Sequence, residues 1–471
     1  MTTQKGTFSR FYLKFKNAPL YKGKSSKSHK VSSNYAVWGL YSLICLLVLN
    51  SYSYLIAQTT QSSSVWIDLD EDESYTARHE CSFVQAGDKF VLFGGRESAQ
   101  KLDIYDFKSN SWSIAKNQAP KEFNHFQATF YKGFIWVIGA FKTNNFPHEV
   151  PEDNIWLYHP PNDIWIKGPE IPEDRRRGGS GLIIYKDKFY IIGGNTKGHN
   201  GGFVNWFDEY DPYKNTWIIL ENASQARDHF SAAVINDTLY AMGGRQSGGS
   251  NGVFAPLIST VDTYNFITKT WSTLPQDLPT PRAAPGIAVF KNQIFVMGGE
   301  GETDGPAYKT VESYNPISGQ WTKESDMNYP RHGTQAIQSG NGIYIAAGSP
   351  KRGGGKQLNM EVYNSHSAKG NPITTSIIKS PQAVDINIED TSFITSKNIN
   401  GNSASFINSI KITGENAYSF KLISNLNHTL IHANSEFLIK VKHLNKNKGE
   451  KASLEIKYNG NIINRIQLKS I

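Results

Sequence analysis

A repeated combination of glycines, a tyrosine and a tryptophan constrains the fold of this 471-residue chain more than any other sequence feature. Two adjacent glycines precede a tyrosine at a variable distance, and a tryptophan stands seven residues beyond that tyrosine. Four copies have this full form: Gly94-Gly95…Tyr105…Trp112, Gly193-Gly194…Tyr210…Trp217, Gly243-Gly244…Tyr264…Trp271 and Gly298-Gly299…Tyr314…Trp321. A weaker copy is Gly139-Ala140…Tyr158…Trp165, and a degenerate copy, Ala347-Gly348…Tyr363, lacks the tryptophan. A fixed unit with one variable loop is typical of a repeat protein.

Each copy has the composition of several short β-strands. In the fifth copy, a small-residue apolar run at 286–290 is followed by the turn Lys291-Asn292 and by the apolar run Ile294–Met297, which leads into the glycines. The tyrosine and the tryptophan each mark a further strand. Four strands every ~50 residues predict one blade of a β-propeller, so the six copies predict an all-β, six-bladed ring.

The tryptophans also predict how the ring closes. They stand at positions 66, 112, 165, 217, 271 and 321, about one blade length apart. Trp66 precedes the first glycine pair, and the sixth copy has no tryptophan of its own. We therefore expect the N-terminal strand around Trp66 to form the outermost strand of the sixth blade, which leaves no exposed sheet edge.

The repeat resembles the kelch family over residues 65–366. The features that carry this resemblance are the glycine pair, an acid two residues before the tyrosine, Asp or Asn after it, and tryptophan at +7. The resemblance implies a kelch β-propeller of the secreted, bacterial type over residues 58–366. The second copy departs from the pattern at Gly139-Ala140 and Tyr158-His159-Pro160, and the sixth departs most.

Residues 372–471 differ in composition from the repeats. Glycine pairs and tryptophan are absent from this part of the sequence, and strands of period two occupy 435–442 and 452–458. About 100 residues of such strands predict an immunoglobulin-like β-sandwich. The end of this region is similar to the ASPM/SPD-2/Hydin-like domains of bacterial surface proteins.

The first 57 residues predict export. Residues 1–35 form a basic tail with eight basic residues and no acid, and residues 36–57 contain the apolar centre Leu40–Leu49. That segment suits either a signal peptide, with cleavage near Ser51-Tyr52-Ser53 or after Ala57, or a retained membrane anchor. In both cases we expect an exported protein that is periplasmic, at the cell surface or secreted, with membrane contact only through residues 36–57.

The net charge of +8 comes from the basic tail. The chain has 49 basic and 41 acidic residues, so the part after residue 35 balances at 41 of each. The charge therefore gives no argument for a nucleic-acid partner. The two cysteines, Cys45 and Cys81, exclude a disulfide framework and a thiolate zinc site.

We call the position 16 residues before the first residue of the glycine pair, or of its equivalent, the arginine register. Five of the six copies have an arginine there. Its members are Arg78, Phe123, Arg177, Arg227, Arg282 and Arg331. The arginines could form an electropositive funnel for an anionic ligand, as they do in kelch propellers that bind acidic peptides. Alternatively, each could pair with the acid two residues before the tyrosine, because the second copy lacks both the arginine and the acid.

Further candidate ligand-binding residues stand near the same positions. His79 and His332 directly follow their arginines, and His125 and His229 stand two residues after the register. The loops after the glycines bring Arg96, Asn195, Arg245 and Glu300 to equivalent positions. The loops at 195–202 and 245–252 suit a variable binding surface, and ordinary solvated loops are the alternative.

The histidines do not predict a metal site. They show no His-x-His or His-x3-His spacing, and a central channel would separate the blades, so we expect no metal and no cofactor. The domain order resembles galactose oxidase, whose copper site needs a cysteine cross-linked to a tyrosine, and Cys81 lacks that context. The sequence contains no nucleophile elbow, phosphate loop or dinucleotide fingerprint.

Two functions from different classes follow. The first is a non-enzymatic module that binds a glycan or a protein, including an acidic ligand, on one face of the propeller, with the sandwich as a spacer. The second is a sialic-acid mutarotase-type epimerase, an activity found among secreted kelch propellers, for which Glu300 and Arg245 would be the catalytic candidates.

Overall fold

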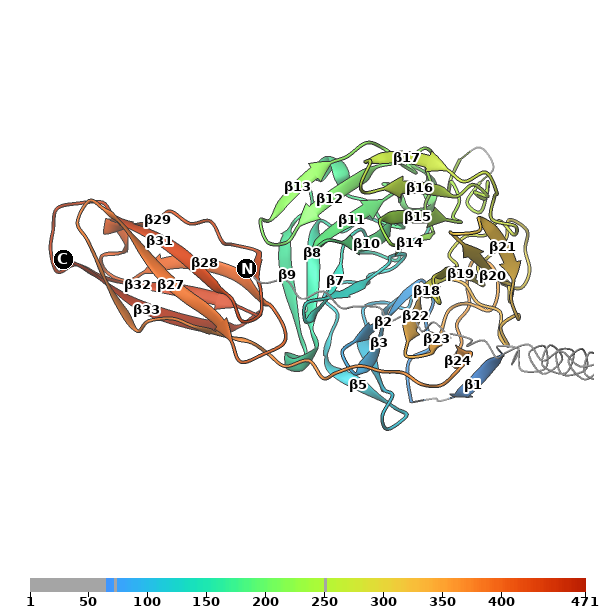
Figure 1. The fold of residues 1–471 in the computed structure, drawn as a ribbon, viewed down its shortest axis with the longest axis horizontal. Helices are drawn as coiled ribbons and strands as arrows, with labels where there is room; N and C mark the ends of the chain where they lie inside the picture. The colour runs from blue at the N-terminus through green and yellow to red at the C-terminus, as the bar shows by residue number, and fades with distance from the viewer. Residues whose placement is uncertain (1–64, 72–73, 250–251) are drawn as a thin grey trace, which may run out of the picture. The chain divides into compact units, whose positions relative to one another are not determined.

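A computed structural model describes residues 65–71, 74–249 and 252–471 (Figure 1). The basic tail and residues 36–57 lie outside the described residues. The described part consists of strands and four short 3-10 helices: η1 (Pro160–Asn162), η2 (Glu173–Arg175), η3 (Gly198–Asn200) and η4 (Ala417–Ser419). In this part of the chain no helix has the length and apolar character needed to cross a membrane.

Within the described residues, Trp66–Tyr363 form six four-stranded antiparallel sheets, numbered here 1 to 6. Sheet 1 has β2 (Cys81–Ala86), β3 (Lys89–Gly94), β4 (Lys101–Asp106) and β5 (Ser111–Gln118), and sheet 2 has β6 (Thr129–Tyr131), β7 (Phe134–Val137), β8 (Asn154–His159) and β9 (Ile164–Glu170). Sheet 3 has β10 (Gly181–Tyr185), β11 (Lys188–Ile192), β12 (Phe207–Asp211) and β13 (Thr216–Ile219), and sheet 4 has β14 (Ser231–Ile235), β15 (Thr238–Met242), β16 (Asp262–Asn265) and β17 (Thr270–Thr273). Sheet 5 has β18 (Gly286–Phe290), β19 (Gln293–Met297), β20 (Val311–Asn315) and β21 (Gln320–Lys323), and sheet 6 has β22 (Ala336–Ser339), β23 (Gly342–Ala346), β24 (Asn359–Tyr363) and β1 (Trp66–Glu71).

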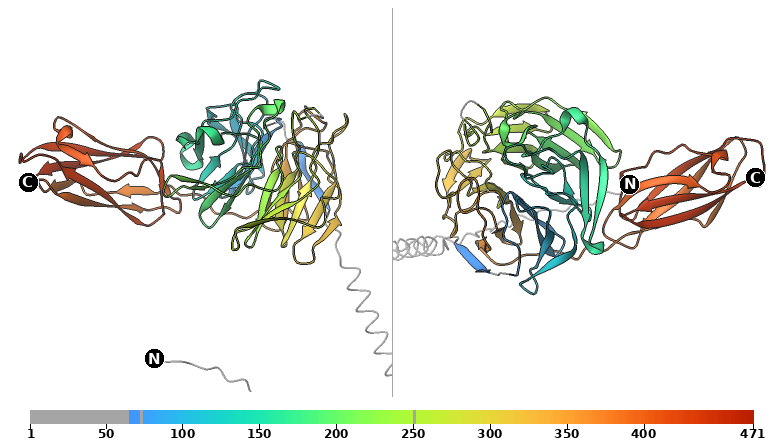
Figure 2. Two further views of the ribbon diagram at one scale, coloured as in Figure 1. Left: turned by 90° about the horizontal axis from the view of Figure 1, so that it is seen from above. Right: turned by 180° about the vertical axis from the view of Figure 1, so that it is seen from behind.

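The six sheets form a closed ring. The first strands β2, β6, β10, β14, β18 and β22 each contact the next in order, and β22 contacts β2. The ribbons show these strands around a common centre (Figure 1, Figure 2). The N-terminal strand β1 pairs antiparallel with β24, with Trp66 opposite Tyr363, so the predicted closing strand is confirmed.

The seven-residue interval places each tyrosine opposite its tryptophan. Tyr105 is the ladder partner of Trp112, and Tyr314 is the partner of Trp321. In sheets 1 to 5 the centroids of the paired rings lie 4.9–5.2 Å apart. The aromatic residues also join neighbouring sheets, since Phe93 of sheet 1 lies 5.8 Å from Trp165 of sheet 2. Such contacts fill the wedges between sheets, as the residue types predict.

The glycine pairs allow adjacent sheets to approach closely. Gly298 and Gly299 have φ values of 63° and 104°, and a Cβ on Gly298 would lie 2.2 Å from the carbonyl oxygen of Arg331. The amide of Gly299 donates to that same oxygen at 2.8 Å. In the degenerate sixth copy Ala347 adopts the same conformation, with φ 57°.

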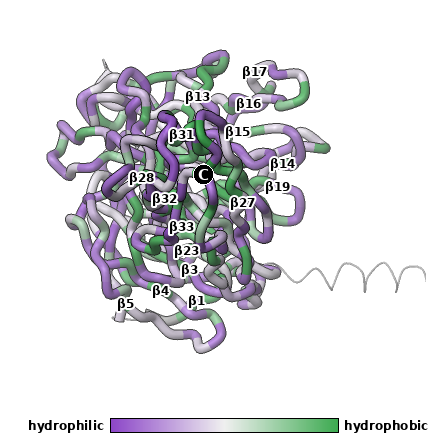
Figure 3. The backbone as a smooth tube through the Cα atoms, turned by 90° about the vertical axis from the view of Figure 1, so that its left-hand side faces the viewer, coloured by the Kyte–Doolittle hydropathy of each residue, from purple (hydrophilic) through white to green (hydrophobic). Residues whose placement is uncertain are grey.

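The C-terminal strands, Ile377–Ser470, form two further sheets. One has the order β25 (Ile377–Lys379), β27 (Thr391–Ile399), β31 (Glu436–His443), β29 (Phe420–Leu422), and the other has β26 (Ala383–Ile386), β33 (Ile462–Ser470), β32 (Lys451–Tyr458), β28 (Ser405–Thr413), β30 (Thr429–Ile431). Ile394, Ile439, Leu454 and Ile466 are buried in one apolar cluster. Apolar and polar stretches alternate along the chain (Figure 3).

Candidate functional site

The mouth of the ring is built on a backbone turn that recurs two residues after the arginine register. At this position φ is positive in all six sheets: Glu80 (54°), His125 (49°), Gly179 (63°), His229 (52°), Ala284 (49°) and Gly333 (67°). Main-chain hydrogen bonds link these residues, which we call the mouth ring. The amides of His125, Gly179, His229, Ala284 and Gly333 each donate to the preceding member at 2.6–3.1 Å, and Cys81 N closes the circle onto Gly333 O at 3.1 Å.

Three members of the mouth ring carry reactive side chains in an unfavourable backbone conformation. A non-glycine residue rarely adopts positive φ, and such outliers concentrate at functional sites. Glu80, His125 and His229 are all more than 90% buried. We therefore expect the functional site to lie next to the mouth ring.

A cavity of about 460 Å³ adjoins the mouth ring at Glu80. Its lining consists of Glu80, Arg96, Phe146, His199, Arg245, Phe254, Glu300 and Gly353. Apart from Glu80, these residues come from the segments that join the second and third strands, and each of the six sheets contributes at least one. Of the four loop residues predicted at equivalent positions, Arg96, Arg245 and Glu300 line this cavity.

Two ion pairs form part of the cavity lining. Arg96 pairs with Glu149 at 2.6 Å, and Arg245 pairs with Glu300. Each guanidinium also lies beside a phenyl ring, since Arg96 is 5.4 Å from the ring centroid of Phe146 and Arg245 is 5.0 Å from that of Phe254. The lining thus combines charged side chains with two phenyl rings, of which Phe146 is 50% exposed.

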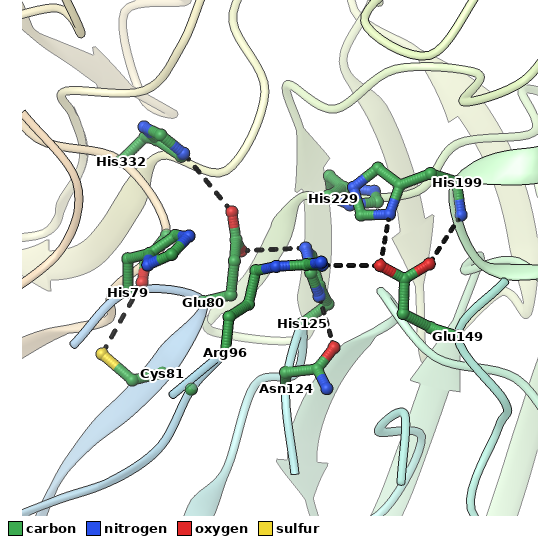
Figure 4. A network of polar contacts seen from close by, with 12 residues as sticks. His79, Glu80, Cys81, Arg96, Asn124, His125, Glu149, His199, His229 and His332 are labelled. Carbon is green, nitrogen blue, oxygen red and sulfur yellow. Dashed lines mark hydrogen bonds and ion pairs between the residues drawn. The ribbon is translucent and has the colours of Figure 1, made fainter. Parts of the chain in front are cut away.

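Three buried histidines meet beside this cavity (Figure 4). The ring centroids of His125, His199 and His229 lie 4.6–4.8 Å apart. A ligating nitrogen of each ring lies within 4.8 Å of the others. The nearest pair is His199 Nε2 and His229 Nε2, at 3.1 Å. His199 belongs to η3, whereas His125 and His229 belong to the mouth ring.

The Nδ1 atom of each of these rings has its own polar partner. His125 Nδ1 lies 2.6 Å from Asn124 Oδ1, His199 Nδ1 lies 2.9 Å from Glu149 Oε1, and His229 Nδ1 contacts the carboxylate of Asp228. These partners are themselves held, as Ser247 donates both its amide and its hydroxyl to Asp228. The Nδ1 atoms are thereby oriented outward from the cluster.

Burial sets the protonation of this cluster. It lowers the pKa of His199 to about 4 and that of His125 well below its usual value, so both rings are neutral near pH 7. Burial raises the pKa of Glu149, but the hydrogen bonds from His199 and Arg96 outweigh it and hold the pKa at about 2. Burial also raises the pKa of Asp228, but the pairing with His229 lowers it by more, so the pKa of Asp228 lies below its usual value.

A second cluster adjoins the first through Glu80. Its Oε2 lies 3.6 Å from His125 Nε2, and its Oε1 lies 3.4 Å from His332 Nε2. His332 Nε2 also lies 3.3 Å from Glu300 Oε2. Burial lowers the pKa of His332, but the carboxylates of Glu300 and Glu80 raise it more, so the pKa lies above its ordinary value.

Two family models match the repeats. Residues 168–348 match the KLHDC2/KLHL20/DRC7 Kelch-repeats domain, and residues 49–253 match the Attractin/LZTR1 beta-propeller. Together they extend over the glycine–tyrosine–tryptophan copies of sheets 1 to 5. Residues 66–363 thus form a ring of six four-stranded sheets, and most of this ring is similar to kelch-repeat β-propellers.

Individual relatives match the kelch propeller at low identity. The Kelch-like protein terF of Aspergillus terreus is 26% identical over 285 residues, which is 58% of this chain and 61% of terF. The Kelch-like protein 25 of Xenopus tropicalis is 28% identical over 276 residues, 56% of this chain and 43% of that protein. The chain thus spans less than two thirds of the length of these relatives. Among solved structures, YjhT covers 62% of this chain and 99% of its own, with a TM-score of 0.52 and 14% identity, which supports the fold alone.

The arginines of the kelch repeats lie inside their own sheets. Arg78, Arg177, Arg227, Arg282 and Arg331 are each at most 2% exposed, and none is among the residues that line the cavity. Each donates to the carbonyl oxygen 16 residues on, at 2.7–3.0 Å, and pairs with the acid before the kelch tyrosine: Asp103, Asp208, Asp262, Glu312 and Glu361. Burial and pairing with an acid of the same sheet are what the structural alternative for these five arginines predicts.

The other predicted site residues divide into two groups. The structure brings Arg96, Arg245, Glu300, His229 and His332 to the cavity or to the clusters beside it. His79 instead pairs with Glu97 at 2.8 Å, and Asn195 is fully buried with its backbone bridged to residues 178 and 203. These last two do not line the cavity.

The expectation that a central channel separates the histidines is wrong for His125 and His229. Both occupy the mouth ring, which brings their ring centroids within 4.6 Å of each other. Glu80 stands at the same register position and could have been found by that criterion. Glu149, Phe146 and Phe254 could not, because they lie in loops whose sequences have no counterpart in the other copies.

Proposed function

We propose that this chain is an exported, six-bladed kelch propeller with a C-terminal immunoglobulin-like sandwich, and that it binds a small polar ligand of the glycan class. The cavity next to the mouth ring carries this proposal. Its volume of about 460 Å³ suits a mono- or disaccharide-sized molecule. Kelch propellers generally serve as protein-binding scaffolds, and a protein partner that presents a glycan would use the same cavity.

The chemistry of the cavity lining suits a sugar. Phe146 and Phe254 offer apolar faces for the C–H side of a pyranose ring, while the carboxylates and guanidiniums beside them offer acceptors and donors for hydroxyl groups. Arg96 and Arg245 already pair with Glu149 and Glu300. An acidic sugar would have to displace one of those carboxylates from its arginine, so the lining favours neutral glycans unless such an exchange occurs.

A thermal-shift screen of the protein against neutral and acidic sugars tests this proposal. A ligand at 100 times its Kd stabilises the fold by about 2.7 kcal/mol, which is visible as a higher Tm. In Phe254→Ala we expect up to roughly tenfold weaker binding, because the ring face is lost. Phe393→Ala, which removes an exposed ring of β27, serves as the matched control. Absence of a shift with every sugar would reject glycan binding.

A specific observation favours a second candidate, a sialic-acid mutarotase-type epimerase. Glu300, His332 and Glu80 place two carboxylates and an imidazole beside the cavity, the carboxylates raise the pKa of His332 above its ordinary value, and Arg245 holds Glu300 in position. Anomer exchange needs such an acid and base near one sugar. Glu300→Gln should then abolish accelerated anomer exchange, followed by NMR, while leaving sugar binding measurable. Exchange at the uncatalysed rate in the wild type would reject this activity.

The export part of the proposal rests on residues 1–57 of the sequence. If the segment at 36–57 is a signal peptide, mass spectrometry of the protein recovered from its host should find a new N-terminus after Ser53 or Ala57. An intact N-terminus in the membrane fraction would instead support the anchor. An intact chain in the cytosolic fraction would contradict export.

A further inference from the structure

We propose that His125, His199 and His229 form a binding site for a divalent transition-metal ion beside the cavity. This inference goes beyond glycan binding and does not depend on it. It rests on three features of the described residues: the facing nitrogens, the partners of the opposite ring nitrogens, and the access from the cavity.

The facing nitrogens require a cation between them. Carboxylates only accept hydrogen bonds, so the Nδ1 atoms of His199 and His229, which face Glu149 and Asp228, must carry protons. A neutral imidazole has one N–H, which leaves a lone pair on each Nε2. These Nε2 atoms lie 3.1 Å apart. Two lone pairs at this separation repel unless a proton or a metal ion lies between them.

Three converging rings favour a metal ion over a shared proton. A proton links two nitrogens, and the third ring, His125, would then have no role in the contact. Its Nδ1 faces Asn124 Oδ1 at 2.6 Å, and its Nε2 lies 3.6 Å from Glu80 Oε2, beyond hydrogen-bond distance, so Nε2 is also available as a ligand. In a tetrahedral zinc site with Zn–N bonds of about 2.0–2.1 Å, the ligand nitrogens lie roughly 3.3 Å apart. The 3.1 Å between His199 Nε2 and His229 Nε2 fits that spacing, and the ligating nitrogens of all three rings lie within 4.8 Å of one another.

The surrounding hydrogen bonds are those that a metal-binding histidine needs. Ligating imidazoles usually donate their other N–H to a carboxylate or carbonyl, which fixes the tautomer and the ring orientation. Asn124, Glu149 and Asp228 provide this support, and each is at most 2% exposed. Glu149 is held in turn by Arg96 at 2.6 Å. The support thus extends to the cavity lining.

The three rings border two hollows. His199 lines the cavity, whereas His125 and His229 line a small hollow bordered by all six members of the mouth ring, and Glu80 borders both. Three protein ligands with an accessible fourth position are typical of catalytic rather than structural metal sites. Glu80 is close enough to His125 to hydrogen-bond to a molecule bound at that position. Imidazole ligands suit Zn²⁺, Cu²⁺, Fe²⁺ and Ni²⁺.

Metal binding can be measured without any sugar. The purified protein is treated with a chelator and titrated separately with Zn²⁺ and Co²⁺. We expect one ion per chain, a visible d–d band for Co²⁺, and X-ray absorption at the zinc edge that reports imidazole nitrogens at about 2.0–2.1 Å. An edge spectrum without imidazole scattering, or no stoichiometric binding, would overturn the proposal.

Variants assign the binding to the three histidines. His199→Ala should weaken Zn²⁺ binding by roughly 100-fold or more, and Glu149→Gln, which alters the support of His199, by about 10- to 100-fold. His148→Ala removes an exposed histidine from the same loop as Glu149 and should leave binding unchanged. Equal Zn²⁺ binding by His199→Ala and by the wild type would overturn the proposed site. If a variant does not fold, the edge spectrum of the wild type still shows whether imidazole nitrogens bind the ion.

Discussion

At the scale of single residues, the arginine register explains why the second sheet departs from the repeat. In the other sheets a buried arginine holds the carbonyl of the first glycine-pair residue and pairs with an acid, as Arg331 does with Ala347 and Glu361. In sheet 2 the same two positions are Phe123 and Trp156, whose rings lie 6.3 Å apart. An apolar pair therefore replaces an ionic pair at one position of the scaffold. Such a replacement of both partners is expected to leave the free energy of unfolding nearly unchanged.

This exchange predicts an asymmetry between single and double substitutions. Arg331→Met should lower the free energy of unfolding by about 3–5 kcal/mol, because it leaves the buried Glu361 carboxylate unpaired. Arg331→Met combined with Glu361→Leu should recover at least about 1 kcal/mol of that loss. Urea unfolding of the wild type and the variants measures both values. A double variant less stable than Arg331→Met alone would contradict the structural role of the pair.

His159 provides a pH-dependent test at the residue scale. It is fully buried, its ring lies 4.9 Å from that of Phe134, and burial lowers its pKa from 6.5 to about 4. The unfolded chain takes up a proton at this residue below pH 6.5 while the folded chain does not. His159 therefore contributes stability above that pH, and the contribution decreases as the pH falls toward 4, by up to about 1.4 kcal/mol per pH unit.

The variant His159→Asn isolates this contribution. Asparagine does not titrate, and it is the residue at the equivalent position of sheets 4 and 5, Asn265 and Asn315. Unfolding free energies measured between pH 7 and pH 4 should decrease less steeply for the variant than for the wild type. Parallel curves would show that His159 is protonated in the folded protein.

The sequence could reveal the arginine register but not the cavity. Arg331 and Glu361 keep fixed spacings to the glycine pair and the tyrosine, so alignment of the copies is enough to find them. Glu149 and His199 lie in loops whose length and sequence differ from copy to copy. Their positions depend on how those loops fold over the mouth ring, for which no spacing rule exists.

At the scale of elements, the mouth ring joins six separate sheets through one repeated turn. Two of its members are glycine, for which positive φ is inexpensive, and Ala284 adopts the same conformation at φ 49°. The remaining positions carry Glu80, His125 and His229, the side chains that border the cavity or the metal site. The turn therefore concentrates backbone strain where the reactive groups lie.

This strain predicts that Ala284→Gly stabilises the protein. The left-handed conformation costs an L-residue roughly 1–2 kcal/mol, which exceeds the roughly 0.5–1 kcal/mol of extra chain entropy that glycine loses on folding. We expect a gain of roughly 0.5 kcal/mol in urea unfolding. Ala288→Gly in β18 is the matched control and should destabilise by roughly 1 kcal/mol. A loss of stability in Ala284→Gly would mean that the turn is not strained at this position.

At the scale of the whole molecule, the ring closes because its first strand returns to its last sheet. Trp66 is 6% exposed, its indole N–H donates to the Ser325 carbonyl at 3.0 Å, and its ring lies 5.5 Å from that of Tyr363. The sequence predicted this closure because the tryptophans are evenly spaced. The prediction succeeded because an open sheet edge exposes unpaired backbone N–H and C=O groups, and a closed ring removes that edge.

Closure makes Trp66 more important than its terminal position suggests. Terminal strands usually fray, but loss of β1 from sheet 6 would open the whole ring. Trp66→Ala should therefore lower the free energy of unfolding by about 3–5 kcal/mol, as for a fully buried core tryptophan. Ile67→Ala, which truncates an exposed neighbour in the same strand, should change it by less than about 0.5 kcal/mol. Unfolding of both variants at the same urea concentration as the wild type would contradict this prediction. The ring would then be held by sheets 1 to 5 and β22–β24 alone, and the pairing of β1 would add nothing to its closure.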